Sequence, residues 1–181
     1  MAYDLVEHRH RFSVWAAARA AQRKLKGGTV EVLRDALEQS GVVAFATANV
    51  SHINQGAFDE VHRTWCRSIT TYLISRGVPG TYGRAVKLIA IYLKSMVILN
   101  GNAETSNVHV IHPPIDGILL NTIRKAPEIQ STHKKAWRKV KWTKLGEDEY
   151  FRLIDQLRLC VGRDEPFWTL ERYWTVTEDQ E

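Results

Sequence analysis

The sequence predicts an all-α fold, a single-domain bundle of about seven helices that occupies residues 1–181. Apolar residues recur at three- and four-residue steps in several segments. Glycine and proline separate these segments, and no two segments show the alternation expected of paired strands. The composition, with 44% hydrophobic and 25% charged residues, is typical of globular proteins. A chain of this length can bury a substantial core, so helices are expected to pack on helices.

Three segments are predicted in the first third of the chain. A helix is expected over residues 4–24, where Gly27-Gly28 follows as a stop, and Thr29 is expected to cap a second helix that Gly41 ends. Residues 42–53 mix β-branched and polar side chains and predict a loop or one short strand, of which the loop is favoured. The residues that recur at three- and four-residue steps are Phe12, Trp15, Ala16, Arg19 and Ala20 in the first helix, and the apolar side of the second is Val30, Leu33, Ala36 and Leu37.

The remaining helices are predicted at residues 55–76, from 81 or 82 to 99, from 114 or 115 onward, at 147–161 and at 166–175. Pro113 and Pro114 hold the preceding backbone out of the α region and mark where a helix can open. The inward faces are Phe58, Val61, His62, Trp65, Ile69, Tyr72 and Leu73, then Ala85, Leu88, Ile89, Tyr92, Leu93 and Met96, and then Ile118, Leu119, Thr122 and Ile123.

The sequence shows neither a secretion signal nor a membrane span, since its longest apolar stretch is interrupted by Lys94 and is too short for a bilayer. The two cysteines, Cys66 and Cys160, lie far apart in helix-like patterns and are expected to be reduced, buried hydrophobes. A cytoplasmic protein without a metal site or cofactor is therefore predicted.

One segment carries the excess positive charge. Residues 134–144 contain six basic and no acidic residues, so a chain of net charge +5 is left with −1 elsewhere. Such a segment can neutralise phosphates, and Trp137 and Trp142 offer faces on which an unpaired base can stack. The alternative is a solvated loop that its tryptophans anchor. The predicted nucleic-acid-binding residues of the segment are Lys134, Lys135, Trp137, Arg138, Lys139, Lys141 and Trp142.

A glycine-rich turn separates two of the predicted helices. In residues 77–85, Gly80 and Gly83 precede Arg84 and Lys87, so that backbone N–H groups could converge on an anion at the next helix. All four residues are predicted to contact nucleic acid. The alternative is an ordinary helix–helix turn that needs glycine for its backbone angles.

Asp116 follows two prolines at the start of an apolar helix and is the candidate catalytic carboxylate. A rigidly held, partly desolvated carboxylate can activate water or stabilise a developing cation. The alternative is an aspartate that complements the helix dipole. His109 and His112 lie on the N-terminal side of the proline pair. Each is a possible proton carrier, and the alternative is a packed histidine.

Taken together, the Ala-rich first helix, the turn Pro79-Gly80-Thr81-Tyr82-Gly83 and Pro114-Ile115-Asp116 resemble the layout of the helix-hairpin-helix DNA glycosylase superfamily. In that all-helical family, a Pro-Gly-x-Gly hairpin grips the DNA backbone and a later aspartate assists cleavage of the glycosidic bond of a flipped base. The resemblance implies that Asp116 is catalytic and that Gly80 and Gly83 lie at the DNA backbone. The His-Pro-Pro-Ile-Asp core at residues 112–116 also resembles an uncharacterised bacterial family, which implies no activity.

The chain departs from the glycosylase pattern at several points. Its turn has one extra residue, the interval to Asp116 is longer, and Arg84 stands where lyase-competent members place a Schiff-base lysine, with Lys87 one turn further on. It has no four-cysteine cluster, so an iron–sulfur cofactor is not expected.

The sequence therefore predicts a partner, nucleic acid with DNA favoured, and offers three functions. The first is base excision by a monofunctional glycosylase-like enzyme. The second is a non-catalytic helical module that binds nucleic acid through the basic segment. The third is a protein–protein adaptor that uses the aromatic residues 167–174.

Overall fold

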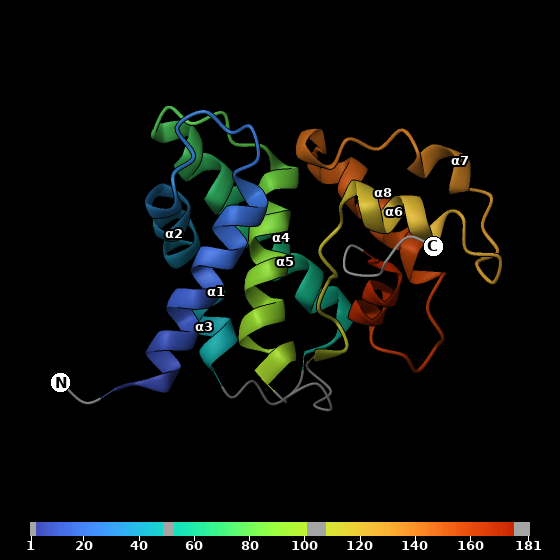
Figure 1. Ribbon diagram of the computed structural model, residues 1–181, viewed down its shortest axis with the longest axis horizontal. Helices are drawn as coiled ribbons and strands as arrows, with labels where there is room; N and C mark the ends of the chain where they lie inside the picture. The colour runs from blue at the N-terminus through green and yellow to red at the C-terminus, as the bar shows by residue number, and fades with distance from the viewer. Residues whose placement is uncertain (1–2, 49–52, 101–107, 176–181) are drawn as a thin grey trace.

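The computed structural model describes residues 3–48, 53–100 and 108–175, and every regular element in these ranges is a helix (Figure 1). The prediction of an all-α bundle is confirmed. The described ranges contain no strand, and none of their helices is both long enough and apolar enough to cross a bilayer.

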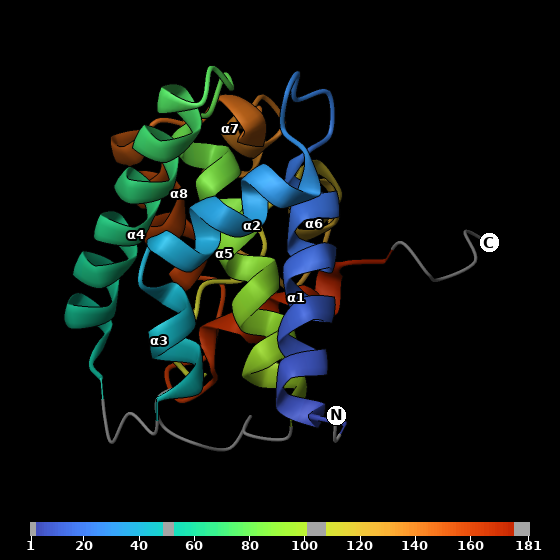
Figure 2. The same ribbon diagram turned by 90° about the vertical axis from the view of Figure 1, so that its left-hand side faces the viewer.

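The first half of the chain forms a bundle around one central helix. Figure 2 shows α5 between α1 and α4, with α2 and α3 across the face toward the viewer. The bounds are Leu5–Ala21 for α1, Val30–Gln39 for α2, Val42–Thr47 for α3, Gln55–Ser75 for α4, Tyr82–Met96 for α5 and Ile98–Asn100 for the short 3₁₀ helix η1.

Side-chain caps begin these helices where the sequence predicts them. Asp4, Thr29 and Thr81 each accept a hydrogen bond from a backbone N–H in the first turn of α1, α2 and α5, respectively. Asn54 caps α4 in the same way. These bonds satisfy N–H groups that have no partner within the helix, which is why the predicted starts are accurate.

The buried face of α1 differs from the predicted stripe. Phe12 and Trp15 are 57% and 50% exposed, while Ala17 and Ala18 are fully buried. Alanine allows α1 to lie close along α5, and an indole or phenyl ring on that face would force the two helices apart. The buried residues of α1 are Ser13, Val14, Ala17, Ala18 and Ala21.

The loop predicted for residues 42–53 is wrong in its first half, where α3 forms. Gly41, with φ of 95°, turns the chain into this helix, and Val42 is fully buried. The ring of Phe45 lies 5.1 Å from that of Trp65 and 5.8 Å from that of Phe58. Tertiary packing therefore outweighs the β-branched composition. Residues 49–52 lie outside the described ranges.

The second half of the chain packs on the opposite side of α5 from α1 and α2 (Figure 1). The predicted final helix at 166–175 is a 3₁₀ helix, and the helix predicted to reach residue 161 ends at Arg158. One cluster of buried hydrophobic residues runs from α1 to η4 and joins the two halves. The bounds are Gly117–Ile123 for α6, Lys134–Trp137 for α7, Trp142–Lys144 for η3, Glu147–Arg158 for α8 and Phe167–Tyr173 for η4.

Candidate functional site

Asp116 is the N-cap of α6. Its Oδ1 accepts hydrogen bonds from the backbone N–H groups of Ile118 at 3.0 Å and Leu119 at 2.9 Å. The two prolines before it, at 113 and 114, are buried and position the cap. The alternative that the sequence offered, an aspartate that complements the dipole of its helix, thus agrees with this N-terminal position.

The other carboxylate oxygen of Asp116 is also engaged. Lys87 on α5 places its Nζ 2.9 Å from Oδ2, and the indole N–H of Trp174 donates to the same oxygen at 3.2 Å. The exposed fractions of the two ion-paired side chains are only 7% for Lys87 and 15% for Asp116.

The pKa of Asp116 lies below its ordinary value. Burial works to raise the pKa, but the Lys87 charge and the hydrogen bonds from Leu119, Lys87 and Trp174 outweigh burial. The carboxylate is therefore ionised at neutral pH with both oxygens occupied. This geometry suits a fixed electrostatic link better than a general base, which needs a free lone pair and a pKa near neutrality.

The glycine turn is occupied by the chain itself. The N–H of Gly83 donates to the carbonyl oxygen of Leu145 at 3.0 Å, and Thr81 Oγ1 donates to the carbonyl oxygen of Thr143 at 2.7 Å. A Cβ on Gly83 would collide with the Trp142 carbonyl oxygen, and one on Gly80 would meet the Cβ of Leu73 at 2.7 Å. Both glycines allow close packing here, and the N–H group predicted to bind phosphate serves η3 instead.

Arg84, predicted to contact nucleic acid, closes the end of another helix. Its guanidinium is buried and donates to the carbonyl oxygens of Ala21 at 2.6 Å and Arg23 at 3.0 Å. These carbonyls belong to the C-terminal end of α1, where a cation is favoured by the helix dipole.

The basic segment, residues 134–144, is exposed along most of its length. The side chains of Lys135, Arg138, Lys139, Lys141 and Lys144 are exposed, and none forms an ion pair within the described part of the chain. Lys134 is the exception, because its Nζ donates to the carbonyl oxygen of Ala126 at 2.7 Å. The remaining cations are thus available to an external anion.

The two tryptophans of the basic segment have different surroundings. Trp137 is 2% exposed, and its indole N–H donates to Gln156 Oε1 at 2.9 Å. It anchors the segment to α8, as the alternative reading of the sequence proposed. Trp142 is half-buried, and Lys87 Nζ lies 5.9 Å from the centroid of its ring.

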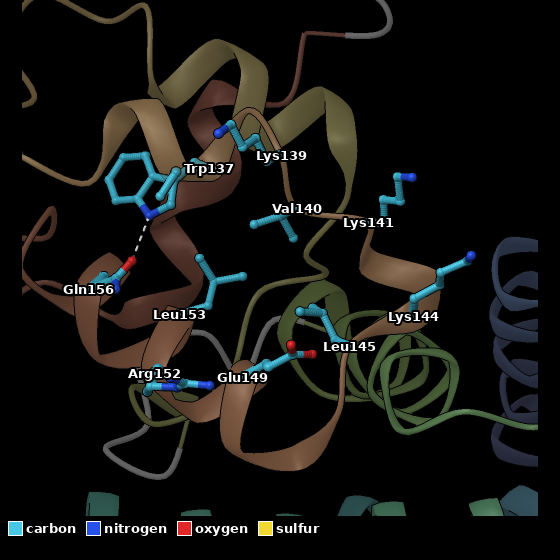
Figure 3. Close-up of a pocket in the computed structure, with 11 residues that line it drawn as sticks. Trp137, Lys139, Val140, Lys141, Lys144, Leu145, Glu149, Arg152, Leu153 and Gln156 are labelled. Carbon is cyan, nitrogen blue, oxygen red and sulfur yellow. Dashed lines mark hydrogen bonds between the residues drawn. The ribbon is translucent and has the colours of Figure 1, made fainter.

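A pocket of about 440 Å³ lies between the basic segment and α8 (Figure 3). One wall comes from residues 136–145 and the other from α8. Val140, Leu145 and Leu153 occupy the middle of the close-up in Figure 3, and charged side chains surround them. The charged lining residues are Lys139, Lys141, Lys144, Arg152 and Glu149.

Asp116 and the basic segment have one neighbour in common, Lys87 on α5. Lys87 contacts the Asp116 carboxylate and faces the Trp142 ring. Asp116 itself does not line the pocket beside Trp137. The carboxylate and the basic pocket are therefore neighbouring features with separate linings.

His112 belongs to a buried network that the sequence did not predict. Its Nδ1 lies 2.8 Å from Tyr150 Oη and its Nε2 lies 2.9 Å from Asp59 Oδ1, which also accepts from Arg158 Nη2 at 2.7 Å. Burial lowers the pKa of His112, although Asp59 opposes this effect. The network ties α4 to α8, whereas His109 is exposed.

His62 stacks against this network without completing its hydrogen bonds. Its ring lies 5.6 Å from that of Tyr150, nearly parallel, and its Nε2 has no partner in the described residues. Burial holds its pKa well below the ordinary value. The described residues contain no group of three or more histidine, cysteine or acidic side chains able to hold a metal ion.

No protein-family model matches the chain, and no curated protein or solved structure matches it. The fold and the site thus define an all-helical protein with a basic pocket on its second half.

Proposed function

We propose that this protein binds nucleic acid non-catalytically, with its basic segment and the adjoining pocket holding the phosphate backbone. The observation that carries the proposal is the group of Lys139, Lys141 and Lys144, exposed at one pocket and without ion pairs among the described residues. Lysines in this state can neutralise successive phosphates and release condensed counterions.

The charge around the pocket supports an anionic ligand. Arg152 adds a fourth cation from α8, and Glu149 is the only acidic residue among the described residues that line the pocket. The Oε2 atom of Glu149 accepts from the N–H of Gly146 at 3.0 Å, which keeps this carboxylate at the helix start. The pocket therefore has an excess of three positive charges to offer a polyanion.

Base excision is a second candidate, favoured by the contact between Lys87 and Asp116 at 2.9 Å. The resemblance to helix-hairpin-helix glycosylases implies a catalytic aspartate, which would stabilise the developing sugar cation without a covalent enzyme intermediate. Excision from duplexes that carry damaged bases tests this activity. If the protein is a glycosylase, Asp116→Asn should lose excision and keep DNA binding. If the wild-type protein shows no excision, non-catalytic binding is the function that remains.

Binding of fluorescent oligonucleotides, followed by anisotropy, tests the main proposal. The variant Lys139→Glu/Lys141→Glu/Lys144→Glu is compared with Arg23→Glu/Lys24→Glu/Lys26→Glu, which removes the same charge from the exposed loop between α1 and α2. The first variant should lose at least tenfold in affinity and the second should retain wild-type binding. Equal affinity of the first variant and the wild type would overturn the proposal.

A further inference from the structure

We infer that the pocket between the basic segment and α8 receives one unstacked nucleobase, so that the protein prefers single-stranded nucleic acid to duplex. This inference rests on the proposed function and names the ligand class of the same site. Its basis is the apolar interior of the pocket, because phosphate binding by itself requires only exposed cations.

The pocket is a partly open hollow with charged side chains around an apolar middle. Its volume of about 440 Å³ is within the usual range for ligand pockets. Val140, Leu145 and Leu153 line the middle, and the lysine side chains extend from the wall opposite α8 (Figure 3). A ligand that matches this lining has a flat, largely apolar body next to an anionic group, which is the chemistry of a nucleotide.

Gln156 supplies a polar group of fixed orientation in the pocket wall. The indole of Trp137 can only donate, so the atom of Gln156 that lies 2.9 Å away is its amide oxygen. The amide nitrogen of Gln156 then keeps both N–H groups without a partner in the described residues. A carboxamide held in this way can donate to the edge of a base.

A base can enter such a pocket only when it is out of its stack. In a duplex, extrusion has a cost of unpairing and unstacking, whereas a single strand offers unpaired bases at little cost. The lysines at positions 139, 141 and 144 lie beside the pocket entrance, where they can hold the phosphates on either side of the inserted base. Single strands are therefore the expected ligand.

Three fluorescent probes separate base binding from backbone binding. They are a twelve-nucleotide oligothymidine, a chain of twelve abasic spacers with the same number of phosphates, and a blunt duplex of twelve base pairs. The protein should bind the oligothymidine about tenfold more tightly than the spacer chain, as stacking contributions predict. It should also bind the oligothymidine more tightly than the duplex, although the duplex carries more phosphates.

A variant that fills the pocket locates the effect. Ala136 lines the pocket and is exposed, so Ala136→Leu adds bulk there without removing any cation or adding an aromatic ring. This change should reduce oligothymidine affinity to that of the spacer chain and leave spacer binding unchanged. Thr132→Leu, at an exposed position outside the pocket lining, is the matched control and should bind as the wild type does. Circular dichroism melts verify that both variants fold.

The outcomes distinguish this inference from the function on which it rests. Equal binding of all three probes, with loss of binding in the Lys139→Glu/Lys141→Glu/Lys144→Glu variant, would overturn base insertion and retain nucleic-acid binding. A preference for oligothymidine that survives Ala136→Leu would overturn the pocket as the site. Failure to bind any probe would overturn both proposals.

Discussion

Lys87 on the central helix and Asp116 at the N-cap of α6 form an ion pair 2.9 Å long in a largely buried position. A second pair, from Lys94 to Glu171 at 2.8 Å, lies two turns further along α5 and holds η4. Trp174 connects the two pairs, because its N–H bonds to Asp116 and its ring lies 5.5 Å from Lys94 Nζ. These contacts fasten the second half of the chain to α5.

Asp116→Asn should lower the free energy of unfolding by about 3 kcal/mol, since it leaves the Lys87 cation buried without its counter-charge. Asparagine can still accept the N–H bonds that cap α6. In the double variant Lys87→Met/Asp116→Asn, part of this loss should be recovered. Urea unfolding of the wild type, Asp116→Asn, Lys87→Met and the double variant measures the coupling between the two residues. Additive effects of the two single changes would contradict the structural role assigned to the pair.

Gly83→Ala should be among the most destabilising single changes in α5. The added Cβ would collide with the Trp142 carbonyl oxygen and weaken the hydrogen bond from Gly83 to Leu145. Gly117→Ala in the first turn of α6 is the matched control, because a Cβ there meets nothing within 4 Å. The control should lie within about 0.5 kcal/mol of the wild type. Similar melting temperatures for the two variants would contradict the docking of η3 on the glycine turn.

The buried face of α1 can be tested with one large and one polar substitution. Ala18 is fully buried, so Ala18→Leu should cost about 1–3 kcal/mol by overpacking. Phe12→Gln, on the exposed face, should change the stability by less than about 0.5 kcal/mol. Chemical denaturation of both variants provides the comparison. If Phe12→Gln were the more destabilising of the two, the buried face of α1 would be the stripe predicted from the sequence.

Stability should fall as the pH drops below about 6.5, the ordinary pKa of histidine. Burial lowers the pKa of His62 in the folded state, so the unfolded chain binds the proton more readily. The contribution of this group is therefore complete above pH 6.5 and is lost as the pH falls toward its folded pKa, by at most about 1.4 kcal/mol per pH unit. His112 acts in the same direction.

His62→Phe isolates this effect. The phenyl ring can keep the stacked contact with Tyr150 and removes the unsatisfied nitrogen. His112, Asp59, Arg63 and Arg158 all influence the charge of His62 electrostatically and remain in the variant. Unfolding measured from pH 7.5 to pH 5 should show a shallower acid loss than in the wild type. An identical pH profile would show that His62 does not titrate with unfolding.

Local signals in the sequence predicted most helices because they are short-range. Thr29 and Thr81 cap α2 and α5 through N–H groups a few residues away. Gly41 and Gly77 follow the ends of α2 and α4 and have the positive φ angles that are common there. The α1 face was mispredicted because the choice between aromatic and alanine stripes depends on how closely α5 approaches. The helix α3 was missed because packing of Val42 and Phe45 decides its structure.

The site was only partly predictable because its contacts join distant positions. Asp116 and the basic segment stood out as isolated features, but the partner of Asp116 is 29 residues away and that of Trp137 is 19 residues away. His112 was noted beside the prolines, whereas Asp59 and Tyr150 lie 53 and 38 residues from it. Periodicity carries no information about such pairings, nor about the pocket that α8 completes.

The salt dependence of binding shows whether the lysines of the basic segment contact phosphates. Oligothymidine affinity is measured between about 50 and 200 mM salt for the wild type and for Lys139→Gln/Lys141→Gln/Lys144→Gln. If these lysines hold phosphates, the slope of log affinity against log salt should decrease in magnitude by about two, from about 0.7 released counterions per phosphate contact. An unchanged slope in the variant would contradict the assignment of this surface to nucleic acid.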